Sequence, residues 1–236
     1  MKKITFNSLF LNYNLLESLI NVTFELEKGK CYLITGPLRA GKSSIFKILK
    51  GFIKGNRGSV RIDDDYFIPF TQNEMAYLAE KTYLYANLTV TEFIRYYLDL
   101  YENFDREKAV EILNELNIGL TRKLSNMSLE EKEILIFILT MCRKTELYLL
   151  DDPMSSTTPE ERIKIINLVF DSLDHDKCIV LATDLLTDIR ETFDTVIFMH
   201  EGHIISILDT KEMKQNSTME IFDDYLHKKS SRRSRV

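Results

Sequence analysis

Two adjacent aspartates, Asp151 and Asp152, follow a short apolar run in the stretch LYLLDDPMSST, residues 147–157. An apolar run of this length, closed by a proline and small polar residues, is typical of a buried strand in a parallel sheet. Proteins with such sheets place their functional groups at the carboxyl ends of the strands. The stretch therefore predicts two carboxylates at a site of chemistry.

A second stretch, GPLRAGKSS at residues 36–44, matches the phosphate-loop pattern G-x-x-x-x-G-K-[ST] between a predicted strand and a predicted helix. Backbone N–H groups and the helix N-terminus would surround phosphate oxygens, and Lys42 would add a positive charge. The Ser43 hydroxyl would coordinate Mg²⁺, with Asp151 as the second partner of the ion. These features predict a P-loop nucleotide-binding protein. The expected nucleotide contacts in the loop are Gly36, Pro37, Leu38, Arg39, Ala40, Gly41, Lys42, Ser43 and Ser44.

The elements that must position these residues alternate between strands and helices. Residues 3–35 have a β pattern, whereas residues 87–143 are helical throughout, with no proline and one glycine. Strand–helix alternation resumes after this block, which predicts an α/β fold with a P-loop NTPase core and a mostly parallel sheet. We expect an N-terminal antiparallel β subdomain and a helical insertion subdomain. Residues 1–215 would form one domain, and residues 216–236 a C-terminal helix and basic tail.

Composition and charge narrow the choice of partners. Hydrophobic residues make up 44% of the chain and its net charge is −5. Five basic residues lie in the last nine positions, so the rest of the chain carries a net charge of −10. This negative charge argues against nucleic acid as the main partner. No run approaches 18 apolar residues, and the three widely spaced cysteines are typical of a reduced cytosolic protein.

Over residues 3 to 210, the chain resembles the ATP-binding subunits of ABC transporters. The segments GSVRIDD, YLAEKTYLYANLTVTEFI, LSNMSLEEKEILIFILT and IVLATDLLTDI follow in the order of that family's motifs, with the phosphate loop before them and LYLLDDPMSSTTP between the last two. The resemblance implies ATP and Mg²⁺ as cofactors and an adenine-stacking role for Tyr13. It places Ser125 and Met127 in a signature motif that contacts the nucleotide. It makes Glu80 a Mg²⁺ ligand and catalytic coupling residue, with Gln72 as the weaker alternative.

The chain departs from the family pattern at several positions where the family does its chemistry. Asp152 stands at the catalytic glutamate, Asp184 at the switch histidine and Thr158 at the aspartate that ends the turn. In the phosphate loop, Leu38 and Arg39 replace the usual asparagine and glycine. The coupling loop has Glu80 in place of glutamine, and the signature has Asn126, Met127 and Ser128 in place of two glycines and a glutamine.

These departures predict slow hydrolysis. Asp152 carries the right group but is one methylene short, and about 1 Å of misplacement can cost on the order of 100-fold in rate. An ionised Asp184 would repel the γ-phosphate. Ser128 and Glu131 predict a capping box that keeps the helix N-terminus of the signature. Met127 is expected to carry a side chain where the backbone approaches the nucleotide.

The resemblance implies a peripheral subunit at the cytoplasmic face of the cell membrane, bound to an integral membrane permease. We expect an ATPase that drives the permease through ATP-induced dimerisation and opens on hydrolysis, with export favoured over import. Two-fold symmetry favours a homodimer, and a heterodimer with a second ATP-binding subunit is the alternative. A non-hydrolysing regulatory subunit of a permease is the competing function. A soluble family member acting on ribosomes or DNA fits less well.

Overall fold

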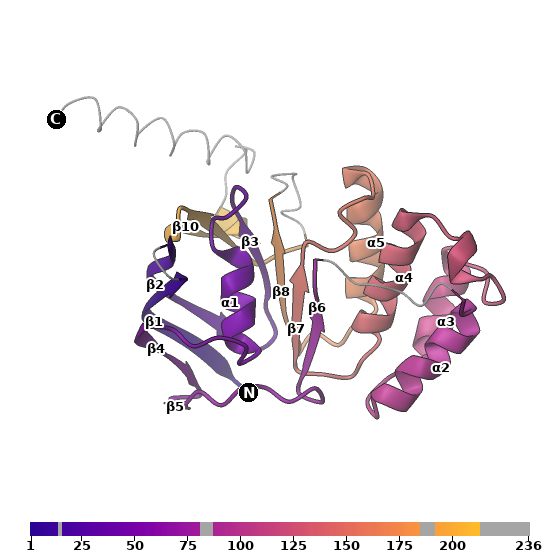
Figure 1. The fold of residues 1–236 in the computed structure, drawn as a ribbon, viewed down its shortest axis with the longest axis horizontal. Coiled ribbons are helices and arrows are strands. Elements are labelled where there is room, and N and C mark those ends of the chain that lie inside the picture. The colour runs from indigo at the N-terminus through magenta and orange to yellow at the C-terminus, as the bar shows by residue number, and fades with distance from the viewer. Residues whose placement is uncertain (14–15, 81–86, 185–191, 213–236) are drawn as a thin grey trace. The chain divides into compact units, whose positions relative to one another are not determined.

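The computed structural model describes residues 1–13, 16–80, 87–184 and 192–212 (Figure 1). The chain divides into two compact units. The first contains residues 1–68 and the described residues from 182 onward, and the second contains residues 69–181. The predicted tail at residues 216–236 lies outside the described residues.

The first unit contains an antiparallel sheet with the strand order β2-β1-β4-β5 (Figure 1). Its strands are β1 (Lys3–Tyr13), β2 (Leu16–Glu27), β4 (Arg57–Ile62) and β5 (Asp65–Tyr66). Phe6 and Phe24 face each other across β1 and β2 with stacked rings 4.3 Å apart. Such cross-strand aromatic pairs fix the register of a sheet and stabilise it. This sheet is the predicted N-terminal antiparallel subdomain.

The first unit also contains the strand that leads to the phosphate loop. Here β3 (Cys31–Thr35) pairs in parallel with β9 (Thr195–His200), which pairs antiparallel with β10 (His203–Asp209). After the loop, the chain continues as α1 (Lys42–Leu49). The four residues from Tyr32 to Thr35 are buried, which explains the unbroken apolar run of this strand. A short 3₁₀ turn, η2 (Thr210–Glu212), follows β10.

In the second unit the strands follow the order β8-β7-β6. They are β6 (Met75–Leu78), β7 (Leu147–Asp151) and β8 (Cys178–Thr183), whose last two residues belong to the first unit. β6 and β7 run in parallel, with Leu78 opposite Leu150. All five residues of β7 are buried, as the apolar run before the two aspartates predicts.

The helices of the second unit include the predicted helical block (Figure 1). They are α2 (Val90–Leu100), α3 (Arg106–Glu115), the 3₁₀ turn η1 (Leu124–Asn126), α4 (Leu129–Met141) and α5 (Pro159–Asp171). In α4 every residue from Ile134 to Met141 is buried, so this helix forms the centre of the unit rather than its surface. Together the two units confirm the predicted α/β fold class, with its parallel strands, antiparallel subdomain and helical part. None of the helices described here is long and apolar enough to cross a bilayer.

Candidate nucleotide-binding site

The phosphate loop between β3 and α1 depends on two glycines that no other residue could replace without strain. Gly36 has a φ of +148° and Gly41 a φ of +104°. A Cβ atom on Gly36 would lie 2.0 Å from the carbonyl oxygen of Met199, and one on Gly41 would lie 2.5 Å from that of Ser18. Both distances are far inside van der Waals contact, so the surrounding backbone requires glycine at each end of the loop.

Hydrogen bonds hold the loop against the strands of the same unit. The backbone N–H of Gly202, in the turn between β9 and β10, donates to the carbonyl of Ala40 at 3.1 Å. Gly202 in turn accepts from the N–H of Ile20 on β2 at 2.8 Å. The hydroxyls of Ser18 and Ser44 lie 2.7 Å apart. The loop is therefore shaped in advance by its surroundings, which is what a phosphate site built from backbone N–H groups requires.

Lys42 lies over this loop. Its ammonium donates to the carbonyl oxygens of Gly36 at 2.7 Å and Pro37 at 3.1 Å. The charge therefore stands beside the N–H groups at the start of α1, where a phosphate group would bind. Leu38 and Arg39, the two departures from the family pattern, are exposed, so neither disturbs the packing of the loop.

Two carboxylates of the second unit gather at the carboxyl ends of β6 and β7. Asp151 ends β7 and is only 6% exposed, whereas Glu80 lies two residues beyond β6 and is exposed. Burial and the negative charges of Asp151 and Glu80 together raise the pKa of Tyr77 to about 12. Both carboxylates thus act on the same phenol. Their oxygens are the ligands that Mg²⁺ prefers, so this part of the predicted donor set fits the ion.

Gln72, the weaker alternative to Glu80, lies at the opposite end of β6. Its backbone carbonyl accepts a hydrogen bond from the buried Arg143. Arg143 also stacks on the ring of Tyr101, with its guanidinium carbon 3.8 Å from the ring centroid. Since the carboxyl edge of the parallel strands is the functional edge, the structure favours Glu80 over Gln72 for the coupling position.

Asp152 lies just beyond β7 in a left-handed backbone conformation, with a φ of +46°. Its side chain is 26% exposed, and its Oδ1 atom lies 3.6 Å from Nη1 of Arg162 on α5. Our sequence interpretation missed Arg162. A signal was present, because Arg162 occupies the same helical face as Ile165, Ile166 and Val169, all of which are buried. A charged residue at an apolar-face position indicates a specific partner.

The turn that follows Asp152 is held by the helices on either side of it. At its end, the Thr158 hydroxyl accepts from the N–H of Glu161 at 3.3 Å and caps α5, with Pro159 at the first helical position. This explains how a threonine can serve at a turn that ends in aspartate in the family. On the other side, Glu133 of α4 accepts from the N–H of Ser156 at 2.9 Å and from its hydroxyl at 3.0 Å. Our sequence interpretation did not predict this second contact.

The signature segment contains the predicted capping box. Ser128 accepts from the N–H of Glu131 at 3.1 Å, and the Glu131 carboxylate accepts from the N–H of Ser128 at 2.8 Å. Arg122 forms an ion pair with Glu131 and donates to the carbonyl of Asn126 at 2.7 Å. The exposed Ser125 hydroxyl donates to the Asn126 side-chain oxygen at 3.3 Å. These hydrogen bonds fix the start of α4. The carboxylate of Glu131 already accepts the N–H of Ser128 there.

Met127 buries its side chain within the second unit. We expected this side chain where the backbone approaches a nucleotide, and the structure shows it only 4% exposed, so its contact with a nucleotide stays a prediction. Its backbone is extended, with φ −93° and ψ 143°, so the position does not need a glycine for conformational reasons. The apolar side chain gains more from packing inside the second unit than from exposure. Contact between Met127 and a nucleotide would have to come from its backbone.

The remaining predicted residues are placed less fully. Asp184 directly follows β8 and is exposed, so it stands at the carboxyl end of that strand. Tyr13 ends β1, where it pairs with Leu16, but its side chain lies outside the described part of the chain. Its role in adenine stacking therefore stays a prediction.

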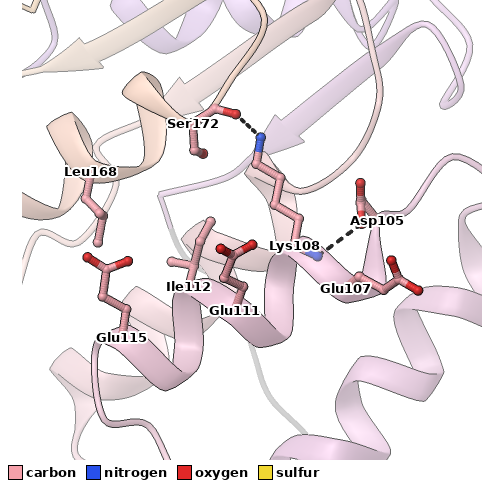
Figure 2. A pocket seen from close by; sticks show the side chains of 8 residues that line it. All are labelled: Asp105, Glu107, Lys108, Glu111, Ile112, Glu115, Leu168 and Ser172. Carbon is pink, nitrogen blue, oxygen red and sulfur yellow. Dashed lines mark hydrogen bonds between the residues drawn. The ribbon is translucent and has the colours of Figure 1, made fainter.

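A pocket of about 440 Å³ lies between α3 and α5 in the second unit. Figure 2 shows Lys108 reaching from α3 to the backbone carbonyl of Ser172, just beyond α5. Half of the residues that line the pocket are carboxylates: Asp105, Glu107, Glu111 and Glu115. So acidic a lining would repel a triphosphate, and no predicted site residue contributes to it. The pocket is therefore not a candidate for the nucleotide site.

Comparison with known proteins gives the same family throughout. The family model described as ABC transporter matches residues 19–155. The chain is 24% identical over 187 residues to the lantibiotic transport ATP-binding protein SrtF of Streptococcus pyogenes. The aligned region covers 78% of this chain and 81% of SrtF. The chain is 28% identical over 200 residues to the molybdate/tungstate import ATP-binding protein WtpC of Archaeoglobus fulgidus, covering 82% and 83%. A solved ATP-binding subunit of an ABC transporter is similar in fold, with a TM-score of 0.77, 20% identity, and coverage of 94% and 99%.

Proposed function

Because this chain belongs to the ABC transporter family, we propose that it is an ATP-binding subunit that powers or gates a membrane permease. It does so through ATP-driven dimerisation and slow ATP hydrolysis. The single observation that carries the proposal is the phosphate loop. Its two required glycines, its hydrogen bonds to the neighbouring strands and the Lys42 ammonium form a preorganised anion site at the N-terminus of α1.

Mg²⁺ would be held by the hydroxyl of Ser43 and the carboxylates of Asp151 and Glu80. Asp151 ends β7 and Glu80 lies two residues beyond β6, and the parallel pairing of these two strands supports this assignment for the second unit. When bound, the ion would neutralise charge on the phosphate oxygens. The chain's own contribution is to hold Asp151 at the buried end of β7, with Glu80 two residues beyond β6 and Ser43 in the first turn of α1.

Asp152 would position the attacking water and accept its proton, and Asp184 would stand at the switch position. Two features favour slow turnover. The Asp152 carboxylate is one methylene shorter than that of a glutamate. Asp184 is exposed and cannot donate a hydrogen bond when ionised. Both features lower the stabilisation of the transition state rather than the binding of ATP.

The subunit would act as a head-to-tail dimer, in which each nucleotide lies between the phosphate loop of one protomer and the signature of its partner. The signature would contribute the exposed Ser125 and the backbone around Met127. A homodimer follows from the usual two-fold symmetry of such assemblies, and a second ATP-binding subunit is the alternative partner. Peripheral attachment to a permease would place the protein at the cytoplasmic face of the membrane.

We propose export as the direction of transport. Among the relatives, SrtF is a lantibiotic transport protein, whereas WtpC is an import protein. Reconstitution of the subunit with its permease in vesicles tests the direction, with ATP supplied only on the side of the cassette. Movement of substrate away from that side supports export, and movement toward it refutes export.

A non-hydrolysing regulatory subunit is the second candidate, and the exposed Asp184 at the switch position favours it. Phosphate release by the purified protein, with and without its permease, separates the two functions. Release that depends on Lys42 supports the ATPase. ATP binding and dimerisation without phosphate release, in both conditions, would establish the regulatory function instead.

Light scattering with ATP and Mg²⁺ measures the dimer, and a monomer at high concentration would refute self-association.

A further inference from the structure

The turn between β7 and α5 carries backbone strain next to the proposed catalytic carboxylate. Asp152 has a φ of +46° and Met154 a φ of +54°, both in the left-handed region. Residues other than glycine occupy this region at a cost, and they remain there only where their surroundings fix them. Some group must therefore hold this turn in shape.

Arg162 is such a group. Its Nε and Nη2 atoms donate to the carbonyl oxygen of Met154 at 3.0 and 2.7 Å. Its Nη1 atom, on the other side of the same planar guanidinium, lies 3.6 Å from Oδ1 of Asp152. One rigid side chain thus binds both strained residues, the first through its carboxylate and the second through its backbone.

The surroundings of Arg162 hold its guanidinium in place. The residue is only 5% exposed, so its charge is shielded from water and its interaction with a carboxylate is strengthened. It lies in the first turn of α5, which is capped by Thr158 and anchored by the buried Ile165 and Ile166. The guanidinium therefore has a fixed position from which to orient the carboxylate.

We propose that Arg162 is a positioning residue for Asp152, and that the ion pair fixes the direction in which this short carboxylate points. The proposal deepens the proposed function and rests on Asp152 acting on the attacking water. An aspartate has less reach than a glutamate, so its orientation matters more. A misplacement of about 1 Å can lower the rate on the order of 100-fold.

The test is a double-mutant cycle on steady-state ATP hydrolysis. Arg162→Gln is expected to lower kcat by about 10- to 100-fold, with KM for ATP changed less than about twofold. Arg162→Lys keeps the charge but loses the fork, and should recover part of the rate. In an Asp152→Asn background, Arg162→Gln should cause no further loss, because no carboxylate remains to be oriented.

Glu133→Gln is the matched control. Glu133 holds the same turn from α4, but it does so at Ser156, four residues beyond Asp152. We expect its kcat to remain within about twofold of wild type. An equal loss of kcat in Glu133→Gln and Arg162→Gln would show that stiffness of the turn is what matters, and would overturn the positioning role. So would a folded Arg162→Gln protein with the wild-type kcat.

A second measurement does not depend on turnover or on the folding of an Arg162→Gln variant. The side-chain Nε–Hε resonance of Arg162, assigned by its loss in Arg162→Lys, should shift in Asp152→Asn and stay unchanged in Glu133→Gln. No shift in Asp152→Asn would refute the pairing, whether or not the protein hydrolyses ATP. A shift in a protein that releases no phosphate would uphold the pairing and refute only the proposed ATPase function.

Discussion

Lengthening the carboxylate at position 152 should accelerate ATP hydrolysis. Asp152→Glu adds one methylene group, which moves the carboxylate by about one C–C bond, roughly 1.5 Å. If reach limits the rate, a misplacement of that size corresponds to about 100-fold in kcat, or about 2.7 kcal/mol of activation free energy. Since the phosphate loop is untouched, the Kd for ATP should stay the same.

The same substitution should also cost stability. Asp152 has a φ of +46°, and aspartate tolerates left-handed backbone better than longer side chains do. We expect the free energy of unfolding to fall by about 1 kcal/mol. Asp64→Glu is the matched control, because Asp64 is exposed in the turn between β4 and β5 with a φ of +74°. It should show a similar loss of stability with no change in kcat.

Phosphate release measures kcat, and urea denaturation measures the free energy of unfolding, for wild type, Asp152→Glu and Asp64→Glu. A folded Asp152→Glu protein that binds ATP normally, with a kcat at or below that of wild type, would refute reach as the limiting factor. Asp184→His, combined with Asp152→Glu, should raise kcat further because it removes a negative charge and adds a donor. The absence of any gain in this double variant would show that charge at the switch position is not limiting either.

Three further predictions concern ATP binding and the stability of the signature. Lys42→Ala should abolish ATP binding because it removes the cation over the phosphate loop, whereas Lys47→Ala, at an exposed position on the same helix, should not. Isothermal titration calorimetry measures the affinity of both variants for ATP, and an unchanged affinity in Lys42→Ala would refute the phosphate site. Tyr13→Ala should weaken ATP binding about tenfold if the ring stacks on adenine, and an equal Kd in a folded variant would assign Tyr13 to packing instead. Ser128→Ala should lower the free energy of unfolding by about 1 kcal/mol, because α4 loses the N-cap hydrogen bond to the N–H of Glu131. Thermal denaturation measures this loss, and an unchanged Tm would contradict the prediction.

The sequence predicted those parts of the site that depend on local pattern. The phosphate loop was found because glycine is required at both of its ends and lysine follows the second, which leaves a fixed spacing. The burial of β7 followed from its apolar run, and the capping box from a serine with glutamate three residues later. Each of these signals lies within about ten residues of chain.

Features that depend on contacts between distant segments escaped prediction. The pairing of Glu133 with Ser156 joins residues 23 positions apart, and neither residue type is unusual where it stands. Met127 was expected to carry a side chain where the backbone approaches a nucleotide, and only the packing of the second unit shows that this side chain is buried. Arg162 carried a signal in the periodicity of α5, but only the fold shows which carboxylate it meets.

The unbroken burial of α4 from Ile134 to Met141 has a consequence for motion within the second unit. This helix contacts both β6 and α3, so it cannot slide or rotate against either without opening apolar surface to water. The signature at its N-terminus and the carboxylates at the ends of β6 and β7 should therefore be displaced together, as parts of one stiff body. Elastic deformation should concentrate instead in the segments that enter and leave this body.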